Sequence, residues 1–201
     1  MLAAALAEGS RRGRAGTRHL MTTPAVTALA TDARLLHLAA EVLGSRAVPY
    51  RATLFEKSGR ANWLVVWHQD TALPLVSRVA SSEWGPWSVK AGVHYAHAPG
   101  WALGGIVAVR VHLDPSTSEN GPLRVIPGSH REGVLADEEV FARARRHEAA
   151  ECVVGLGGVV AMRPLLIHSS SKAWVDAPRR VIHIEYAVSL DLGPGLRLAV
   201  A

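Results

Sequence analysis

The residues best suited to chemistry in this sequence are a histidine and an aspartate that stand two positions apart, His68 and Asp70. They follow a run of β-forming residues, and side chains two apart on a strand point to the same face. Asn62, Leu64 and Val66 share that phase, so the face is apolar until its last two positions and is expected to point inward. An imidazole and a carboxylate in this arrangement can bind one divalent metal ion.

A third ligand can come from His168, far along the chain. The residues before it, 163–167, are expected to form an apolar strand, and a polar turn of three serines follows it. Two histidines and one carboxylate form the facial triad that is diagnostic of non-haem Fe(II) oxygenases, and this triad leaves coordination positions open. The arrangement therefore predicts a metal centre built from His68, Asp70 and His168.

Such oxygenases consume a 2-oxo acid, whose distant carboxylate needs a cation near the metal. The candidates are Arg179, eleven residues after His168, and its neighbour Arg180. In the β-forming run 181–188 every second residue is apolar, and this apolar face is in phase with Arg180. Arg179 is instead in phase with His183. Periodicity alone points Arg180 into a barrel, so both arginines remain candidates.

Most of the remaining sequence is predicted to form short strands separated by turns. A helix is expected from a cap at Thr31 or Asp32 to Gly44, because apolar residues recur at helical spacing between them. Residues 138–150 are a second, shorter helical candidate. Many short strands without alternating helices favour a sandwich or barrel of the jelly-roll kind. The β-rich runs are residues 51–55, 62–67, 106–113, 123–126, 151–154, 159–162 and 181–188.

The composition is typical of a soluble globular domain, because 49% of the 201 residues are hydrophobic and 19% are charged. No apolar run approaches the roughly 18 residues of a membrane helix. The single cysteine, Cys152, excludes an internal disulfide and a thiolate zinc cluster, and it fits a reducing compartment. We therefore expect a cytoplasmic protein that does not bind membranes.

The net charge of +5 is concentrated at the start of the chain. Residues 1–20 hold four arginines and one glutamate, so the other 181 residues carry only +2. Nucleic-acid binding is therefore not expected. Residues 1–23 lack hydrophobic periodicity and the apolar core of a secretory signal. We interpret them as a disordered tail or as sequence read before a true start at Met21, with an organelle transit peptide as the alternative, and residues 24–201 as a single domain.

An ordered set of motifs resembles the phytanoyl-CoA dioxygenase family: His68-Gln-Asp70, then Asn120-Gly-Pro-Leu-Arg-Val-Ile-Pro-Gly-Ser-His130, then His168 and Arg179. The resemblance spans about residues 48–190. It implies a mainly β fold, a double-stranded β-helix (jelly-roll, cupin-like barrel) with a few flanking helices. It also implies a hydroxylase that uses Fe(II), 2-oxoglutarate and O2, and that releases succinate and CO2 while it acts on a small-molecule substrate.

The resemblance implies roles for single residues. His68, Asp70 and His168 would bind iron, and Arg179 would bind the far carboxylate of 2-oxoglutarate. Ser170, two residues after the distal histidine, resembles a residue that helps to hold the same carboxylate. Related halogenases lack the carboxylate at the position of Asp70, so its presence argues for hydroxylation over halogenation.

Four further residues are weaker candidates. Trp87 and Lys90 lie where family members contact cosubstrate or substrate, Asn62 shares the predicted inward face, and Lys57, beside Phe55, ranks below these three. The first three also have an ordinary structural explanation: packing for Trp87, a solvated charge for Lys90 and a strand-edge hydrogen bond for Asn62. His130 is expected to belong to a turn.

Two other classes of protein fit part of these observations. One is a catalytically silent jelly-roll that binds a small ligand, and the other is a different cupin-type metalloenzyme. The intact ligand residues count against the first class, and the second class does not require the late arginine. The sequence leaves the substrate open and is compatible with a monomer or a homodimer.

Overall fold

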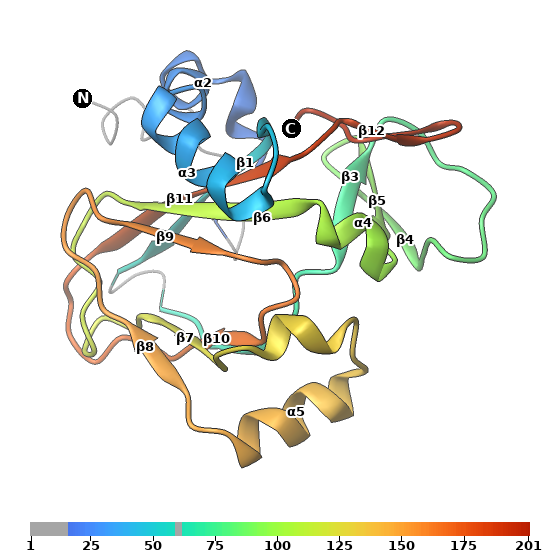
Figure 1. Ribbon diagram of the computed structural model, residues 1–201. Coiled ribbons are helices and arrows are strands. Elements are labelled where there is room, and N and C mark those ends of the chain that lie inside the picture. The colour runs from blue at the N-terminus through green and yellow to red at the C-terminus, as the bar shows by residue number, and fades with distance from the viewer. Residues whose placement is uncertain (1–15, 59–61) are drawn as a thin grey trace.

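Short antiparallel strands make up most of the protein in the computed structural model, which describes residues 16–58 and 62–201 (Figure 1). The helices are η1 (Leu20–Thr22), α2 (Pro24–Ala30), α3 (Ala33–Leu43), α4 (Gly100–Gly104), η2 (Ser129–Glu132) and α5 (Asp137–Arg146). The strands are β1 (Val48–Lys57), β2 (Val65–His68), β3 (Ala72–Leu75), β4 (Trp87–Lys90), β5 (Val93–His97), β6 (Ile106–His112), β7 (Leu123–Val125), β8 (Ala150–Cys152), β9 (Val159–Met162), β10 (His168–Ser170), β11 (Arg179–Ala187), β12 (Asp191–Gly193) and β13 (Leu196–Arg197).

Two four-stranded sheets form the body of the molecule. Their strand orders are β1-β11-β6-β9 and β2-β10-β7-β8, and all pairs are antiparallel. The sheets lie one above the other in Figure 1, with α2 and α3 outside the first and α5 outside the second. This arrangement confirms the predicted mainly β jelly-roll fold with a few flanking helices.

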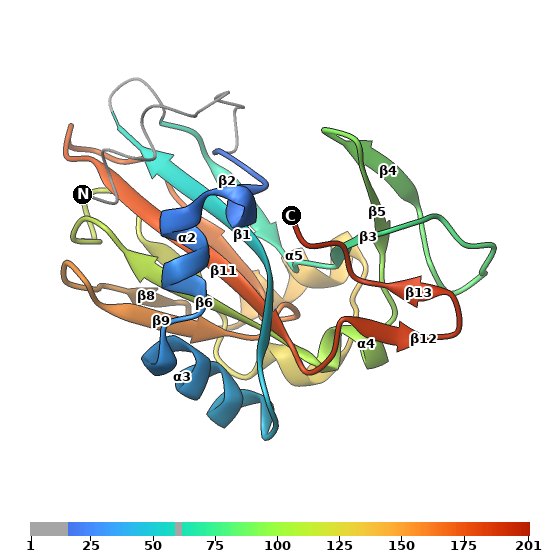
Figure 2. The ribbon, with the colours of Figure 1, turned by 90° about the horizontal axis from the view of Figure 1, so that it is seen from above.

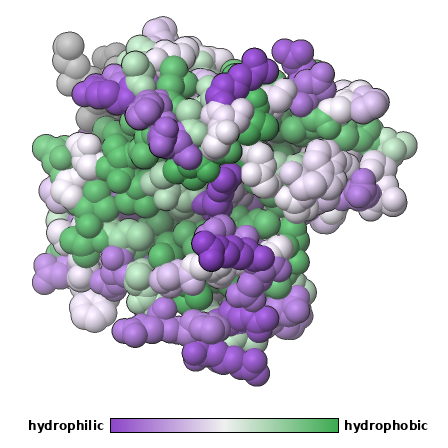
Figure 3. Space-filling model, in the orientation of Figure 1, coloured by the Kyte–Doolittle hydropathy of each residue, from purple (hydrophilic) through white to green (hydrophobic). Residues whose placement is uncertain are grey.

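Two smaller sheets, β3-β5-β4 and β12-β13, lie together at one end of the larger sheets (Figure 2). The predicted strands did not include these segments. On the face shown in Figure 3, the side formed by α5 is hydrophilic, in agreement with the many charged residues of this helix. Within the described residues, no helix combines the length and the apolar character needed to cross a membrane.

The helix α3 confirms the prediction from its capping residues. The Asp32 side chain accepts a hydrogen bond from the backbone N–H of Arg34, and Gly44 ends the helix in the left-handed conformation. The second predicted helix is shorter than expected, because α5 ends at Arg146 and the chain enters β8 at Ala150.

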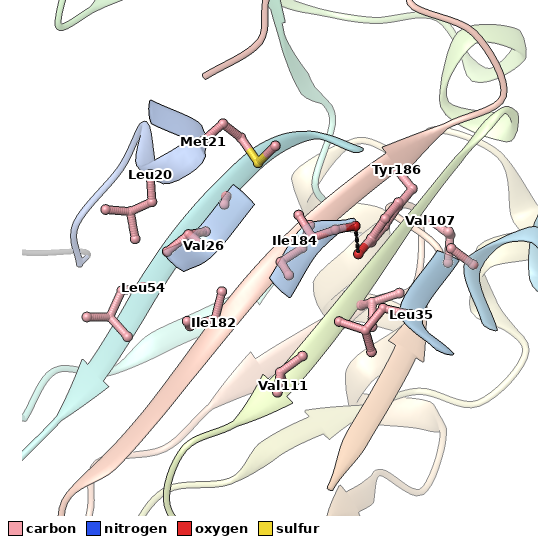
Figure 4. Close-up of a cluster of buried hydrophobic side chains, with 14 residues drawn as sticks. Leu20, Met21, Val26, Leu35, Leu54, Val107, Val111, Ile182, Ile184 and Tyr186 are labelled. Carbon is pink, nitrogen blue, oxygen red and sulfur yellow. Dashed lines mark hydrogen bonds between the residues drawn. The ribbon is translucent and has the colours of Figure 1, made fainter. Parts of the chain in front are cut away.

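The largest apolar core lies between the first sheet and helices η1, α2 and α3 (Figure 4). Ile182, Ile184 and Tyr186 of β11 belong to this core, and the Tyr186 hydroxyl donates a hydrogen bond to the Ala30 carbonyl at 3.0 Å. The apolar face of β11 therefore points toward the helices and away from the space between the two large sheets. Arg180 therefore does not point into the barrel as periodicity predicted, because helices cover the apolar face of this sheet.

The predicted inward face is wrong for the residues before His68, although His68 and Asp70 themselves line a pocket. Leu64 and Val66 are 58% and 55% exposed. The pairing of β2 with β10 shifts register, because His68 pairs with His168 whereas Val65 pairs with Ser170. Three steps along β2 thus match two steps along β10, which is the count of a β-bulge. The bulge reverses the phase before His68.

The apolar run before His168 forms a turn where a strand was predicted. Strand β9 ends at Met162 and β10 begins at His168, and residues 163–167 between them contain turns and a bend. The carbonyl of Pro164 in this turn accepts a hydrogen bond from the backbone N–H of Asp70 at 2.9 Å. The turn therefore helps to position a candidate ligand.

Most of the segment interpreted as a tail lies outside the described residues, which begin at residue 16. The remaining part packs on the first sheet. Thr17 exchanges two backbone hydrogen bonds with Leu54 of β1, at 2.8 and 2.9 Å, and Leu20 and Met21 are buried in the apolar core. Packing against β1 thus begins before residue 24.

Candidate active site

The structure brings together the three residues predicted to bind a metal ion. His68 ends β2, Asp70 follows it, and His168 begins the neighbouring strand β10. Nε2 of His68 lies 3.7 Å from one Asp70 carboxylate oxygen, and Nε2 of His168 lies 3.5 Å from the other. One ligand atom from each residue lies within 4.8 Å of the others, which is close enough for all three to hold one ion.

The hydrogen bonds of both imidazoles favour metal binding. Nδ1 of His68 contacts the Val66 carbonyl at 2.8 Å, and Nδ1 of His168 contacts the Leu166 carbonyl at 2.7 Å. A carbonyl only accepts, so each Nδ1 carries the proton and each Nε2 keeps its lone pair for a ligand. Such a backbone contact is the usual support behind a metal-bound histidine.

The protonation states of the triad suit a cation as well. Burial lowers the pKa of His168 to about 4, so this imidazole is neutral at physiological pH. Burial opposes the ionisation of Asp70, but its electrostatic interaction with His168 and its hydrogen bond with His68 outweigh this effect and hold the pKa of the carboxyl well below its usual value. Contacts with Asp70 raise the pKa of His68 in spite of its burial, so a bound metal ion would replace a proton at its Nε2. Two imidazole nitrogens and one carboxylate match the donor set of a divalent transition metal.

A small pocket lined by the three triad residues also contains Arg179. The Arg179 side chain comes from the inner face of β11 and is only 3% exposed. Its Nη2 lies 3.4 Å from the hydroxyl of Ser170 on β10, whereas its Nε and Nη1 have no hydrogen-bond partner in the described part of the chain. A buried guanidinium with unpaired donors favours an anionic ligand.

Arg180 points to the opposite side of the sheet. Its guanidinium forms two hydrogen bonds with the carboxylate of Asp114, both at 2.7 Å. The structure therefore places Arg179 in the pocket and Arg180 outside it.

The same pocket holds two cations that the sequence did not single out strongly. Lys57, the cross-strand partner of Arg179, is 1% exposed and donates hydrogen bonds to the Ser170 hydroxyl at 2.7 Å and to the Ser171 carbonyl. Burial, together with the charge of Arg179, lowers the pKa of Lys57 to about 8. Arg110 of β6 also lines the pocket and lies over the ring of Phe55.

The alternation of side chains between the two faces of β1 and β6 could have identified Lys57 and Arg110. This signal requires knowing which face of the sheet points inward, and the sequence does not state that. The inward face also carries other charged and polar residues. Arg51 of β1 pairs with Glu185 of β11, and His183 of β11 pairs with Arg110 of β6.

Two weaker candidates lie away from the triad. Asn62 is exposed, and its side-chain amide forms two hydrogen bonds with the backbone of Ala173, at 2.7 and 2.9 Å. Its predicted inward position is wrong because of the bulge in β2. Trp87 lies in β4, and its Nε1 donates a hydrogen bond to the Trp84 carbonyl at 3.0 Å. Neither residue lines the pockets that border the triad.

The sequence profile of the phytanoyl-CoA dioxygenase (PhyH) family matches residues 6–181. The chain belongs to this family. Among characterised proteins, it is similar to the L-proline trans-4-hydroxylase of Streptomyces griseoviridis, with 28% identity over 178 residues. That match covers 76% of this chain and 59% of the hydroxylase. It is also similar to the ectoine dioxygenase of Sphingopyxis alaskensis, with 31% identity over 131 residues, covering 63% of this chain and 36% of the dioxygenase.

The chain thus spans about three fifths and one third of the lengths of these two family relatives. Solved structures show the same fold. AviO1 from Streptomyces viridochromogenes Tue57 matches with a TM-score of 0.64 and 26% identity, over 96% of this chain and 73% of its own. EctD from S. alaskensis with bound Fe matches with a TM-score of 0.62 and 25% identity, over 86% of this chain and 56% of its own.

Proposed function

We propose that this protein is an Fe(II)- and 2-oxoglutarate-dependent dioxygenase that hydroxylates a small molecule. The observation that carries the proposal is the convergence of two histidine Nε2 atoms and one carboxylate beside a pocket that contains the buried, unpaired Arg179. Two relatives support it, because they are named as a proline hydroxylase and an ectoine dioxygenase, and EctD is known with Fe and with 2-oxoglutarate.

In this proposal His68, Asp70 and His168 hold the iron, as the donor set and the lone pairs on Nε2 allow. When bound, Fe(II) supplies the chemistry that reduces O2, with 2-oxoglutarate and the substrate C–H bond as the sources of electrons. One oxygen atom enters the new hydroxyl group and the other enters succinate, while the carboxyl next to the keto group leaves as CO2. The carboxylate of Asp70 would be one of the iron ligands, and the resemblance to the family therefore favours hydroxylation over halogenation.

The protein's own residues bind and orient the cosubstrate. The guanidinium of Arg179 pairs with the far carboxylate of 2-oxoglutarate, and the Ser170 hydroxyl, which lies between Arg179 and Lys57, orients both donors toward it. Lys57 and Arg110 add positive charge to a pocket that has to accept a dianion. The apolar side chains of Phe55, Val65 and Leu123 exclude water from the remaining wall.

Anaerobic addition of Fe(II) and 2-oxoglutarate tests the proposal. We expect a weak visible charge-transfer band that needs both components, and its loss in His68→Ala and Asp70→Ala. His130→Ala removes a histidine from η2, far from the triad in sequence and outside both pockets, and should keep the band. Absence of the band in the unaltered protein, or its persistence in His68→Ala, would exclude the proposed site.

A further inference from the structure

A second pocket borders His68 and Asp70 of the triad. It shares His68 and Asp70, together with Phe55, Trp63 and Val65, with the pocket that contains Arg179. Because Arg179 and Lys57 line only the first pocket, the second one is the space from which a substrate can approach the metal centre. The walls that are unique to it include Arg18, Arg51, Lys90, Tyr95 and His97.

Tyr95 of β5 organises the polar wall of this second pocket. Its ring is buried, with Nζ of Lys90 at 4.9 Å and Cζ of Arg51 at 5.9 Å from the ring centroid. Its hydroxyl lies 3.0 Å from Nε2 of His19. Segments that are distant in sequence, namely residues 18–19, β1, β4 and β5, thus meet around one aromatic ring.

The charges on this wall are not balanced. Arg51 is neutralised by the buried carboxylate of Glu185, to which its Nη2 donates a hydrogen bond at 2.8 Å. Among residues 16–58 and 62–201, no carboxylate forms an ion pair with Arg18 or Lys90. The pocket lining contains one acid, Asp70, which belongs to the triad.

The wall therefore carries two cations that no acid of the described chain neutralises. Burial, and then the charges of Arg18 and Arg51, lower the pKa of Lys90, which agrees with the closeness of the three cations. Arg18 and Lys90 are exposed, so water screens much of their mutual repulsion, and both remain available to an anion that binds between them.

We propose that Arg18 and Lys90 bind an anionic group of the substrate, a carboxylate or a phosphate ester, and so direct the rest of the molecule toward the triad. This inference rests on the proposed function for the identity of the second pocket as the substrate site. The predicted substrate is a small organic anion. Arg18 contributes from a segment before α2, whose pairing with Leu54 holds it beside the pocket.

A pair of fluorescent probes tests the charge preference without iron and without turnover. 1-Anilinonaphthalene-8-sulfonate is an anion, and N-phenyl-1-naphthylamine has the same ring system without the sulfonate. We expect the anion to bind more tightly, and Arg18→Gln and Lys90→Gln each to weaken it by about tenfold, the loss of one hydrogen bond to a charged group. The affinity for the neutral probe should stay the same.

Arg145→Gln is the matched control, because it removes one exposed positive charge from α5 without touching the pocket. It should leave both affinities unchanged. Equal affinity for the two probes, or an anion affinity that survives Arg18→Gln combined with Lys90→Gln, overturns the proposal. Circular dichroism and the melting temperature establish that each variant is folded.

Displacement of the bound anion identifies the source of the negative charge. Displacement by benzoate indicates a carboxylate substrate, and displacement by phenyl phosphate indicates a phosphate ester. Benzamide is the neutral control, and displacement by benzamide as effective as by either anion overturns the proposal. Because these titrations contain no iron, failure of the triad to bind Fe(II) would remove the proposed function while leaving the anion site measurable by itself.

Discussion

Two neighbouring arginines show how much depends on the direction of one side chain. Arg180 satisfies its charge with Asp114, whereas Arg179 is buried with two nitrogens unpaired. Burying a guanidinium without an acid costs several kcal/mol in general, and a bound carboxylate offsets that cost. The two residues therefore form a matched pair for testing which arginine binds the cosubstrate.

Arg179→Gln should raise the dissociation constant of 2-oxoglutarate by roughly 30- to 1,000-fold, since truncating one partner of a buried charge pair costs about 2–4 kcal/mol. Calorimetric titration with Zn(II) in place of Fe(II) measures this change. Arg180→Gln should stay within about twofold of the unaltered protein. The assignment of the cosubstrate pocket is wrong if Arg180→Gln produces the larger loss.

We expect Lys57 to make the affinity for 2-oxoglutarate depend on pH. Its pKa of about 8 means that the side chain is charged below that pH and neutral above it, and only the charged form attracts a carboxylate. We expect the affinity to fall by about five- to tenfold between pH 7 and pH 9. In Lys57→Met the affinity should be lower at pH 7 and constant across this range. A fall of the same size in Lys57→Met would contradict the assignment to Lys57.

At the scale of elements, a one-residue bulge and one turn bring the site together. The bulge in β2 places Val65 and His68 on the inner face, where strict alternation places Leu64 and Val66. The turn before β7 brings Gly121 against β10, and its carbonyl accepts a hydrogen bond from the Ser170 hydroxyl at 2.9 Å. These local features position Ser170 between Arg179 and Lys57.

Gly121→Ala should destabilise the protein more than Gly128→Ala, although both glycines have positive φ values, +70° and +83°. A Cβ at residue 121 would lie 2.4 Å from the Ser171 carbonyl oxygen and 3.0 Å from Nζ of Lys57, whereas one at residue 128 meets open space. We expect losses of about 3 and about 1 kcal/mol, or roughly 6–12 °C and 2–4 °C in Tm.

Thermal unfolding followed by circular dichroism checks this difference, and the affinity for 2-oxoglutarate should fall in Gly121→Ala alone. Equal losses in Tm for the two variants would show that the close approach of Gly121 to β10 is not a constraint.

At the scale of the whole molecule, one face of the first sheet packs in the apolar core and the other face lines the candidate active site. The outer face of the sheet, with Ile182, Ile184 and Tyr186, packs on η1, α2 and α3, while its inner face carries Lys57 and Arg179. The polar face of this sheet is the enclosed one, and helices cover its apolar face. The helices, and with them Met21 and Leu20, are therefore needed to bury the apolar side.

Ile184→Ala should lower the free energy of unfolding by about 3 kcal/mol and Tm by roughly 6–12 °C, because it leaves a cavity between the sheet and the helices. The folded variant should bind 2-oxoglutarate as the unaltered protein does. Leu156→Ala is the control, since Leu156 is 70% exposed, and it should change stability by less than about 0.5 kcal/mol. Loss of cosubstrate affinity in Ile184→Ala at a temperature where it is folded would show that the two faces are coupled.

Local sequence patterns were sufficient to predict one helix, the fold class and the three candidate metal ligands. Helix α3 followed from Asp32, Gly44 and the apolar residues between them, because capping and helical spacing are interactions among neighbours in sequence. The jelly-roll class followed from many short strands, and His68, Asp70 and His168 were found from residue type and position at the ends of β-forming runs. Family resemblance, and not periodicity, preferred Arg179 to Arg180.

The tertiary structure alone decided which faces enclose the site. Successive side chains of a strand lie on opposite faces of the sheet, but the face that becomes interior depends on what packs against it. In this protein helices cover the apolar face. The register of β2 against β10 likewise depends on a partner a hundred residues away, so neither the bulge nor the exposure of Asn62 was visible locally. Arg18 reaches the second pocket for the same reason, because its segment is held there by pairing with Leu54 of β1.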